Sequence, residues 1–120
     1  MFLSVNLVLC VVLFLSGFIM VYVTVASKVE AENIARILLE ERLVACVNIL
    51  GPVFSHFCWE GKVDSAEEYL MIMKTDVRLF VGLEKRVGAL HSYEVPEILA
   101  VPIVEGSKSY FDWMLSVLPL

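Results

Sequence analysis

The residues best suited to chemistry in this chain lie close together after residue 90. His91, Tyr93, Glu94 and Glu97 place an imidazole, a phenol and two carboxylates in one short segment. Imidazole and carboxylate groups can hold a metal ion or move a proton near neutral pH. One interpretation of His91 is therefore a ligand or hydrogen-bonding group in a cleft. The other is a structural histidine that complements a helix dipole, because a helical pattern ends near Leu90.

Other residues could line such a cleft. Trp59 and Glu60 are expected at the tip of a hairpin, where they either form a cleft wall or serve only packing and solubility. Lys74 ends a strand that is otherwise apolar on both faces, so its charge needs a carboxylate such as Glu60 or Glu94, or an anionic ligand. His56, inside a long extended stretch, is expected to be structural or exposed.

Several function classes are disfavoured by the sequence. It contains no glycine-rich phosphate loop, no HExxH pair, and no Cys or Ser nucleophile with a His base nearby, so we expect no enzyme. The net charge is −5 and no run of Lys or Arg occurs. Nucleic-acid binding is therefore not expected, because it needs a basic surface against the phosphates.

The cysteines indicate a reducing environment. Cys10, Cys46 and Cys58 are odd in number and show no Cys-x-x-Cys spacing. We expect small, buried apolar residues, with a Cys46–Cys58 disulfide as the alternative.

Periodicity predicts the elements that position these residues. Ser27 and Glu30 form a capping box, in which the hydroxyl accepts from the Glu30 amide and the carboxylate reaches back. The expected elements are a strand at 20–26, a helix at 28–42, an extended stretch at 44–59, a strand at 68–75 after a polar connection, a helix ending near 90, a strand at 97–104 and a short helix after 107. This order predicts a ferredoxin-like βαββαβ sandwich of the α+β class with a C-terminal helix.

The length of the second extended stretch predicts an oligomer. Residues 44–59 would span roughly 50 Å if extended, whereas a compact domain of this size is only about 30 Å across. Even with a bend at Gly51-Pro52, the hairpin should extend beyond its own sheet. An exposed apolar strand invites unwanted pairing unless a partner covers it. We therefore expect an obligate oligomer.

Five segments resemble the CutA divalent-cation tolerance family in order and spacing. They are RLVACVNIL (42–50), WEGKV (59–63), EEYLMIMKT (67–75), HSYEVPEI (91–98) and YFDW (110–113). The similarity extends from residue 20 to about 117. It implies a ferredoxin-like fold assembled as a homotrimer through long hairpins, binding of a divalent metal, copper in particular, and no established catalysis.

The resemblance also implies a metal site. The family's ligands are usually a cysteine late in the first strand, where this chain has Thr24, and a histidine at the position of His91; Leu90 and Ser92 depart from the family pattern. We expect Cu(II), or else Zn(II), on His91, Glu94 and Glu97, in an intersubunit cleft lined by Trp59, Glu60, Lys74 and Tyr93. The alternative is a trimer resembling PII-type regulatory proteins, which binds a protein or a small anionic ligand.

The chain begins with an apolar segment. Residues 1–27 carry no charge, but 20–26 is needed for the first strand, and 1–19 is shorter than the about 20 apolar residues that span a bilayer. We interpret 1–19 as an extension before a domain at 20–120. It would be an anchor, a signal peptide or the result of a misassigned start. We expect a cytoplasmic protein, with membrane anchoring or export through 1–19 as the alternative.

Overall fold

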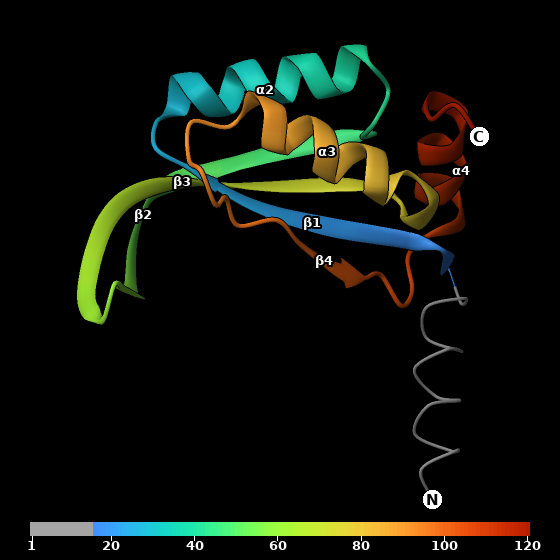
Figure 1. Cartoon of the computed structure of the whole chain (residues 1–120). Helices are drawn as coiled ribbons and strands as arrows, with labels where there is room; N and C mark the ends of the chain where they lie inside the picture. The colour runs from blue at the N-terminus through green and yellow to red at the C-terminus, as the bar shows by residue number, and fades with distance from the viewer. Residues whose placement is uncertain (1–15) are drawn as a thin grey trace, which may run out of the picture.

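The computed structural model of the chain describes residues 16–120, and its elements follow the predicted order (Figure 1). They are β1 (Phe18–Val25), α2 (Lys28–Glu40), β2 (Cys46–Trp59), β3 (Lys62–Asp76), the 3-10 turn η1 (Val77–Leu79), α3 (Phe80–Leu90), β4 (Leu99–Pro102) and α4 (Lys108–Val117). The anchor and signal predicted for the first residues lie outside the described part of the chain. Within residues 16–120, no helix is long and apolar enough to cross a membrane.

The strands form one antiparallel sheet in the order β2-β3-β1-β4. Helices α2 and α3 lie on one face of the sheet, and α4 stands at the end where β1 begins (Figure 1). This arrangement confirms the predicted ferredoxin-like α+β sandwich with a C-terminal helix.

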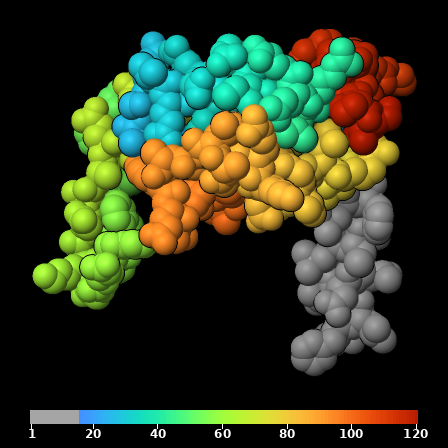
Figure 2. All heavy atoms as spheres, turned by 45° about the horizontal axis from the view of Figure 1, so that its top comes forward, coloured from blue at the N-terminus to red at the C-terminus, as the bar shows by residue number. Residues whose placement is uncertain are grey.

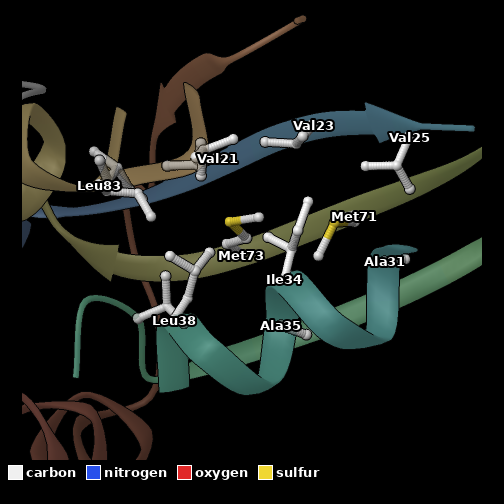
Figure 3. Packing of buried hydrophobic residues seen from close by; sticks show 13 residues of the cluster. Val21, Val23, Val25, Ala31, Ile34, Ala35, Leu38, Met71, Met73 and Leu83 are labelled. Atoms are coloured by element: carbon white, nitrogen blue, oxygen red, sulfur yellow. The ribbon is translucent and has the colours of Figure 1, made fainter. Parts of the chain in front are cut away.

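The core lies between the sheet and the two helices, because both surfaces are apolar there (Figure 3). Val21, Val23 and Val25 of β1 are fully buried, as are Ile34 and Leu38 of α2. Other buried members of this cluster are Ala31, Ala35, Met71, Met73, Leu83 and Val87. Burying a side chain such as Val or Leu contributes about 1.5–3 kcal/mol, so this layer holds the helices on the sheet.

The start of α2 is fixed by Ser27, as predicted. The Glu30 amide donates to the Ser27 hydroxyl at 3.1 Å. The other half of the predicted capping box is wrong. The Glu30 carboxylate turns away from the helix start and accepts hydrogen bonds from the amide and the hydroxyl of Ser92. Glu30, which the motif assigns to a local contact at the helix start, thus makes a long-range contact with Ser92.

Strands β2 and β3 continue beyond the helices as an arm, residues 51–68. Glu60 and Gly61 alone connect the two strands, with φ values of 50° and 76°, as a tight hairpin turn requires. The predicted polar connection and a strand starting at Glu68 are therefore wrong, because β3 begins at Lys62. The Cα radius of gyration is 15.9 Å, compared with about 13 Å for a compact domain of 100 residues. The predicted long hairpin is confirmed.

A bulge at Gly51-Pro52 separates the arm from the rest of the sheet. The bulge reverses the alternation of side chains along β2. Asn48 before it and Val53 after it are an odd number of positions apart and yet lie on the same face of the sheet. The arm bends away from the helices (Figure 1). We call the face on the inside of this bend the inner face and the opposite face the outer face. The inner face carries Val53, Ser55, Phe57, Trp59, Lys62, Asp64, Ala66 and Glu68, and the outer face carries Phe54, His56, Cys58, Val63, Ser65 and Glu67.

The sheet face opposite α2 and α3 is not covered by another layer within the described residues, and we call it the open face (Figure 1). The strand register places on it Met20, Tyr22, Leu50, Leu70, Ile72, Leu99 and Val101. All of them are at least partly exposed. An exposed apolar surface of this kind is typical of an interaction site.

Two strand ends differ from the prediction. β1 begins at Phe18 instead of residue 20, and the Phe18 ring stacks on Phe111 of α4 with ring centres 4.6 Å apart. β4 comprises only Leu99–Pro102 instead of 97–104. Pro102 lacks the amide that would continue the ladder, so the strand ends there.

The cysteines of the described part are free thiols. The predicted burial is wrong for Cys58, which is exposed, and only partly right for Cys46, which is half-buried. No disulfide joins them. Cys10 lies outside the described residues.

Candidate functional site

His91 caps the end of α3 and is buried. Its amide bonds to the Val87 carbonyl at 2.9 Å, and its side chain has no exposed surface. Ring Nε2 lies 2.7 Å from the backbone oxygen of Thr24, and the Tyr93 amide nitrogen lies 2.9 Å from ring Nδ1. The imidazole therefore ties the end of α3 to the end of β1.

These two hydrogen bonds fix the form of the His91 ring. A backbone carbonyl only accepts, so Nε2 must carry the proton that it donates to Thr24. A backbone amide only donates, so Nδ1 must offer its lone pair to the Tyr93 N–H. The ring is thus the neutral Nε2–H tautomer with both nitrogens engaged. A metal ion needs a free lone pair, and this ring has none.

Two carboxylates accept hydrogen bonds from the residues that follow His91. Glu30 accepts from the amide and the hydroxyl of Ser92, each at 2.9 Å, and its Oε2 lies 3.8 Å from Nδ1 of His91. Figure 2 shows the segment after α3 lying against the start of α2. The nearly buried Glu68 accepts from the Tyr93 hydroxyl at 2.8 Å. Burial, this hydrogen bond and the negative charges of Glu68 and Glu30 raise the pKa of Tyr93 to about 12.

The other predicted metal ligands, Glu94 and Glu97, are exposed. No group of three His, Cys, Asp or Glu side chains that could hold a metal ion occurs within residues 16–120. Copper and zinc favour imidazole and thiolate, whereas carboxylates alone suit harder ions. Within one chain, the donor set of His91, Glu94 and Glu97 does not fit Cu(II) or Zn(II), because its imidazole is already engaged.

Lys74 lies on the open face next to α4. Its Nζ donates to Asn48 Oδ1 at 2.9 Å and lies 5.8 Å from the centre of the Tyr110 ring. Neither Glu60 nor Glu94 pairs with it within one chain, and no ion pair of Lys74 occurs among the described residues. Its charge is partly satisfied by an amide and an aromatic ring, not by an anion.

The predicted cleft residues occupy three separate places in one chain. Trp59 and Glu60 form the tip of the arm, and Trp59 is 54% exposed. Tyr93 lies at the base of the arm through its bond to Glu68. Lys74 lies towards the other end of the sheet, about 13 Å along β1 from the partner of His91. A cleft that contains all of them would need a second copy of the chain.

Sequence reasoning missed Glu30 and Glu68 as members of this site. Their partners lie 62 and 25 residues away along the chain, so no local pattern predicts the contacts. One feature of the sequence pointed to Glu68, because it alternates with Leu70 and Ile72 and so shares a strand face with them. A charged side chain in an apolar row needs a polar partner.

Comparison with known proteins connects these features to a family. Residues 19–117 match the family described as CutA1 divalent ion tolerance protein. The chain is 48% identical over 94 residues to the divalent-cation tolerance protein CutA of Thermus thermophilus, which covers 78% of this chain and 91% of that protein. It is 44% identical over 96 residues to the chloroplastic protein CutA of Arabidopsis thaliana, which covers 80% of this chain and 53% of that protein. The family is named for ion tolerance, not for a catalysed reaction.

Solved structures show the same fold. The periplasmic divalent cation tolerance protein CutA from Archaeoglobus fulgidus has a TM-score of 0.81 at 45% identity, covering 83% of this chain and 97% of that chain. CutA1 from Shewanella sp. SIB1 has a TM-score of 0.85 at 30% identity, covering 89% of this chain and 100% of that chain. The resemblance found in the sequence segments is confirmed. The chain belongs to the CutA1 divalent ion tolerance protein family.

Proposed function

We propose that this chain is a homotrimeric divalent-cation tolerance protein with ligand clefts where its subunits meet. The observation that carries the proposal is the apolar surface that one chain leaves exposed. On the open face Leu99 is 60% and Val101 is 39% exposed, and on the inner face of the arm Phe57 is 39% and Trp59 is 54% exposed. Covering this surface with other copies stabilises it by about 25 cal/mol for each Å² buried. Three copies is the number that membership of the family suggests.

In the proposed trimer, the arm of each copy contacts a neighbouring copy. The arm continues β2 and β3 beyond the bulge at Gly51-Pro52 and projects away from the helices of its own chain (Figure 1). A neighbouring copy that packs on the open face lies within reach of the arm. Trp59 and Glu60 of one copy then approach Tyr93, Glu94 and Lys74 of another, which completes the cleft.

In this arrangement the exposed carboxylates of Glu94 and Glu97 bind the cation. Cu(II) is the first ion to test and Zn(II) the second. His91 positions the loop that carries the two carboxylates, through its bonds to Thr24 and Tyr93. Because carboxylates alone are poor ligands for copper and zinc, we expect weak binding.

Sedimentation velocity at micromolar concentration tests the assembly. The wild type should have three times the 13.5 kDa mass of the chain. Ile72→Asp places a charge on the open face and should produce smaller species. Val29→Asp is the matched control, because Val29 is 77% exposed on α2, and it should leave the mass unchanged. A stable, folded wild-type monomer contradicts the proposal.

Calorimetric titration with Cu(II) and then Zn(II) tests the ligands. Glu94→Gln and Glu97→Gln should each weaken binding, whereas Glu84→Gln, an exposed carboxylate on α3, should not. No heat from either ion in the wild type contradicts cation binding. Loss of binding in a folded His91→Ala trimer, with normal binding in Glu94→Gln, would show that the imidazole is the ligand.

One observation favours the second candidate, a PII-like trimer that binds a small anion. Lys74 has no anionic partner among the described residues and lies on the face that a neighbour would cover. Titration with inorganic phosphate should then give heat that Lys74→Gln abolishes. Absence of heat with phosphate in the wild type rejects this candidate.

A further inference from the structure

We propose that His56 and Cys58, on the outer face of the arm, form a binding site for a soft metal ion, with Cu(I) as its ligand. The two residues are separated by one position in β2 and therefore share one face of the strand. This site is distinct from the clefts proposed above, since it uses neither Glu94 nor Glu97.

The spacing of the pair suits a single metal ion. Residues two apart in a strand have Cα atoms about 6.7 Å apart. Metal bonds to sulfur and nitrogen of roughly 2.3 and 2.0 Å separate the two donor atoms by about 4 Å. The thiol and the imidazole need only lean toward each other to meet this distance. Their cross-strand neighbours, Val63 and Ser65, are exposed and lack long side chains.

Both donor groups are available. His56 and Cys58 are exposed, and within residues 16–120 neither side chain has a salt-bridge partner or a disulfide. Figure 2 shows the arm projecting away from the helices. His91 differs from this pair, because both of its ring nitrogens already make hydrogen bonds.

The ligand types and the charge of the arm favour a soft cation. Thiolate selects Cu(I) and zinc, and imidazole suits copper and zinc. Cu(I) forms stable two-coordinate complexes, whereas zinc sites require about four ligands, and no third ligand group gathers around this pair in the described structure. Residues 53–67 also carry Glu60, Asp64 and Glu67 against a single Lys62, which raises the local concentration of cations.

Binding needs no redox step. Cu(I) is supplied as Cu(I), the Cys58 thiol releases its proton to solvent, and bonds form from the metal to sulfur and to one imidazole nitrogen. Because the thiol must lose a proton, binding of Cu(I) releases a proton.

The test is an anaerobic competition titration of the full chain against a chromophoric Cu(I) chelator. All forms carry Cys10→Ser, so that this cysteine does not contribute. Cys58→Ser and His56→Ala should each weaken Cu(I) binding by at least about 10–100-fold. Loss of a residue that only hydrogen-bonds to a metal ligand already has an effect of this size. Cys46→Ser is the matched control, because Cys46 is half-buried on the open face opposite Lys74, and it should retain full affinity.

Two results would overturn the proposal. One is a Cys58→Ser or His56→Ala protein that binds Cu(I) within threefold of its parent. The other is a Cys46→Ser protein that loses as much affinity as Cys58→Ser. Glu84→Gln, an exposed carboxylate on α3 outside both sites, should leave Cu(I) binding unchanged. The clefts are tested separately with Cu(II) and Zn(II), so failure of this site and failure of the proposed clefts can be told apart. Circular dichroism and sedimentation show that each variant is folded and assembled like its parent.

Discussion

Replacing His91 by Ala removes the only side chain that joins α3, β1 and the 91–93 turn through hydrogen bonds within the described structure. Two backbone groups lose their partner, the Thr24 carbonyl and the Tyr93 amide. The ring that leaves is fully buried, so a cavity replaces it. We expect a large loss of stability from a residue that the sequence also allowed as a metal ligand.

The magnitude follows from these contacts. An unsatisfied buried polar group costs about 1–3 kcal/mol, and two groups are affected. Water that enters the cavity would satisfy part of this, so the expected loss is about 2–5 kcal/mol of unfolding free energy. At roughly 2 kcal/mol per molar urea for a small domain, the unfolding midpoint falls by about 1–2.5 M.

Urea unfolding followed by circular dichroism measures this loss. All proteins are compared at one chain concentration, because the proposed assembly would make apparent stability depend on it. His56→Ala is the control: His56 is exposed, and surface changes usually stay within about 0.5 kcal/mol. His91→Gln can restore a donor near the Thr24 carbonyl, and His91→Asn can restore an acceptor near the Tyr93 amide. Each should recover part of the loss.

A His91→Ala protein as stable as the His56→Ala protein would refute the structural role of the ring. Nitrogen NMR gives an independent check, because the bonding pattern requires the proton on Nε2 and a bare Nδ1. A wild-type His91 that carries its proton on Nδ1 would contradict the assignment regardless of stability.

Three further predictions concern other parts of the fold. Since folding raises the pKa of Tyr93 from 10.0 to about 12, stability should fall as pH rises from 10 to about 12, and Tyr93→Phe should lose this slope in urea midpoints. Gly51→Ala would place a Cβ 2.5 Å from Tyr69 and should cost about 1–3 kcal/mol, whereas Gly88→Ala, in open space on α3, should stabilise; thermal unfolding compares them. Ser27→Ala removes the cap of α2 and should cost about 1 kcal/mol in the same measurement.

The sequence predicts the body of the fold well because local patterns determine it. The alternating valines of β1 and the Ser27 cap of α2 depend on neighbours along the chain. The first part of β3 was missed because Asp64, Ser65 and Glu67 interrupt the apolar alternation. In an arm that stands away from the core, backbone pairing alone makes the strand, so apolar alternation is not required there.

The candidate site is harder to predict because its contacts are long-range. Position 91 was selected correctly as a key residue, but its partners are a backbone carbonyl and an amide, which no side-chain pattern reveals. Glu30 satisfies a helix-cap motif in the sequence and yet bonds to Ser92. A motif limits which contacts a residue can make, and tertiary packing then chooses among them.

The bulge at Gly51-Pro52 turns the arm into a lever with its pivot at the edge of the domain. From Val53 to the turn at Glu60 the arm is about 25 Å long. A change of about 10° at the pivot therefore moves the tip by about 4 Å, roughly the spacing of one strand. Small adjustments of two residues would decide where Trp59 meets a neighbouring chain. In the proposed trimer, the bulge would thus determine where the arm of one copy reaches another.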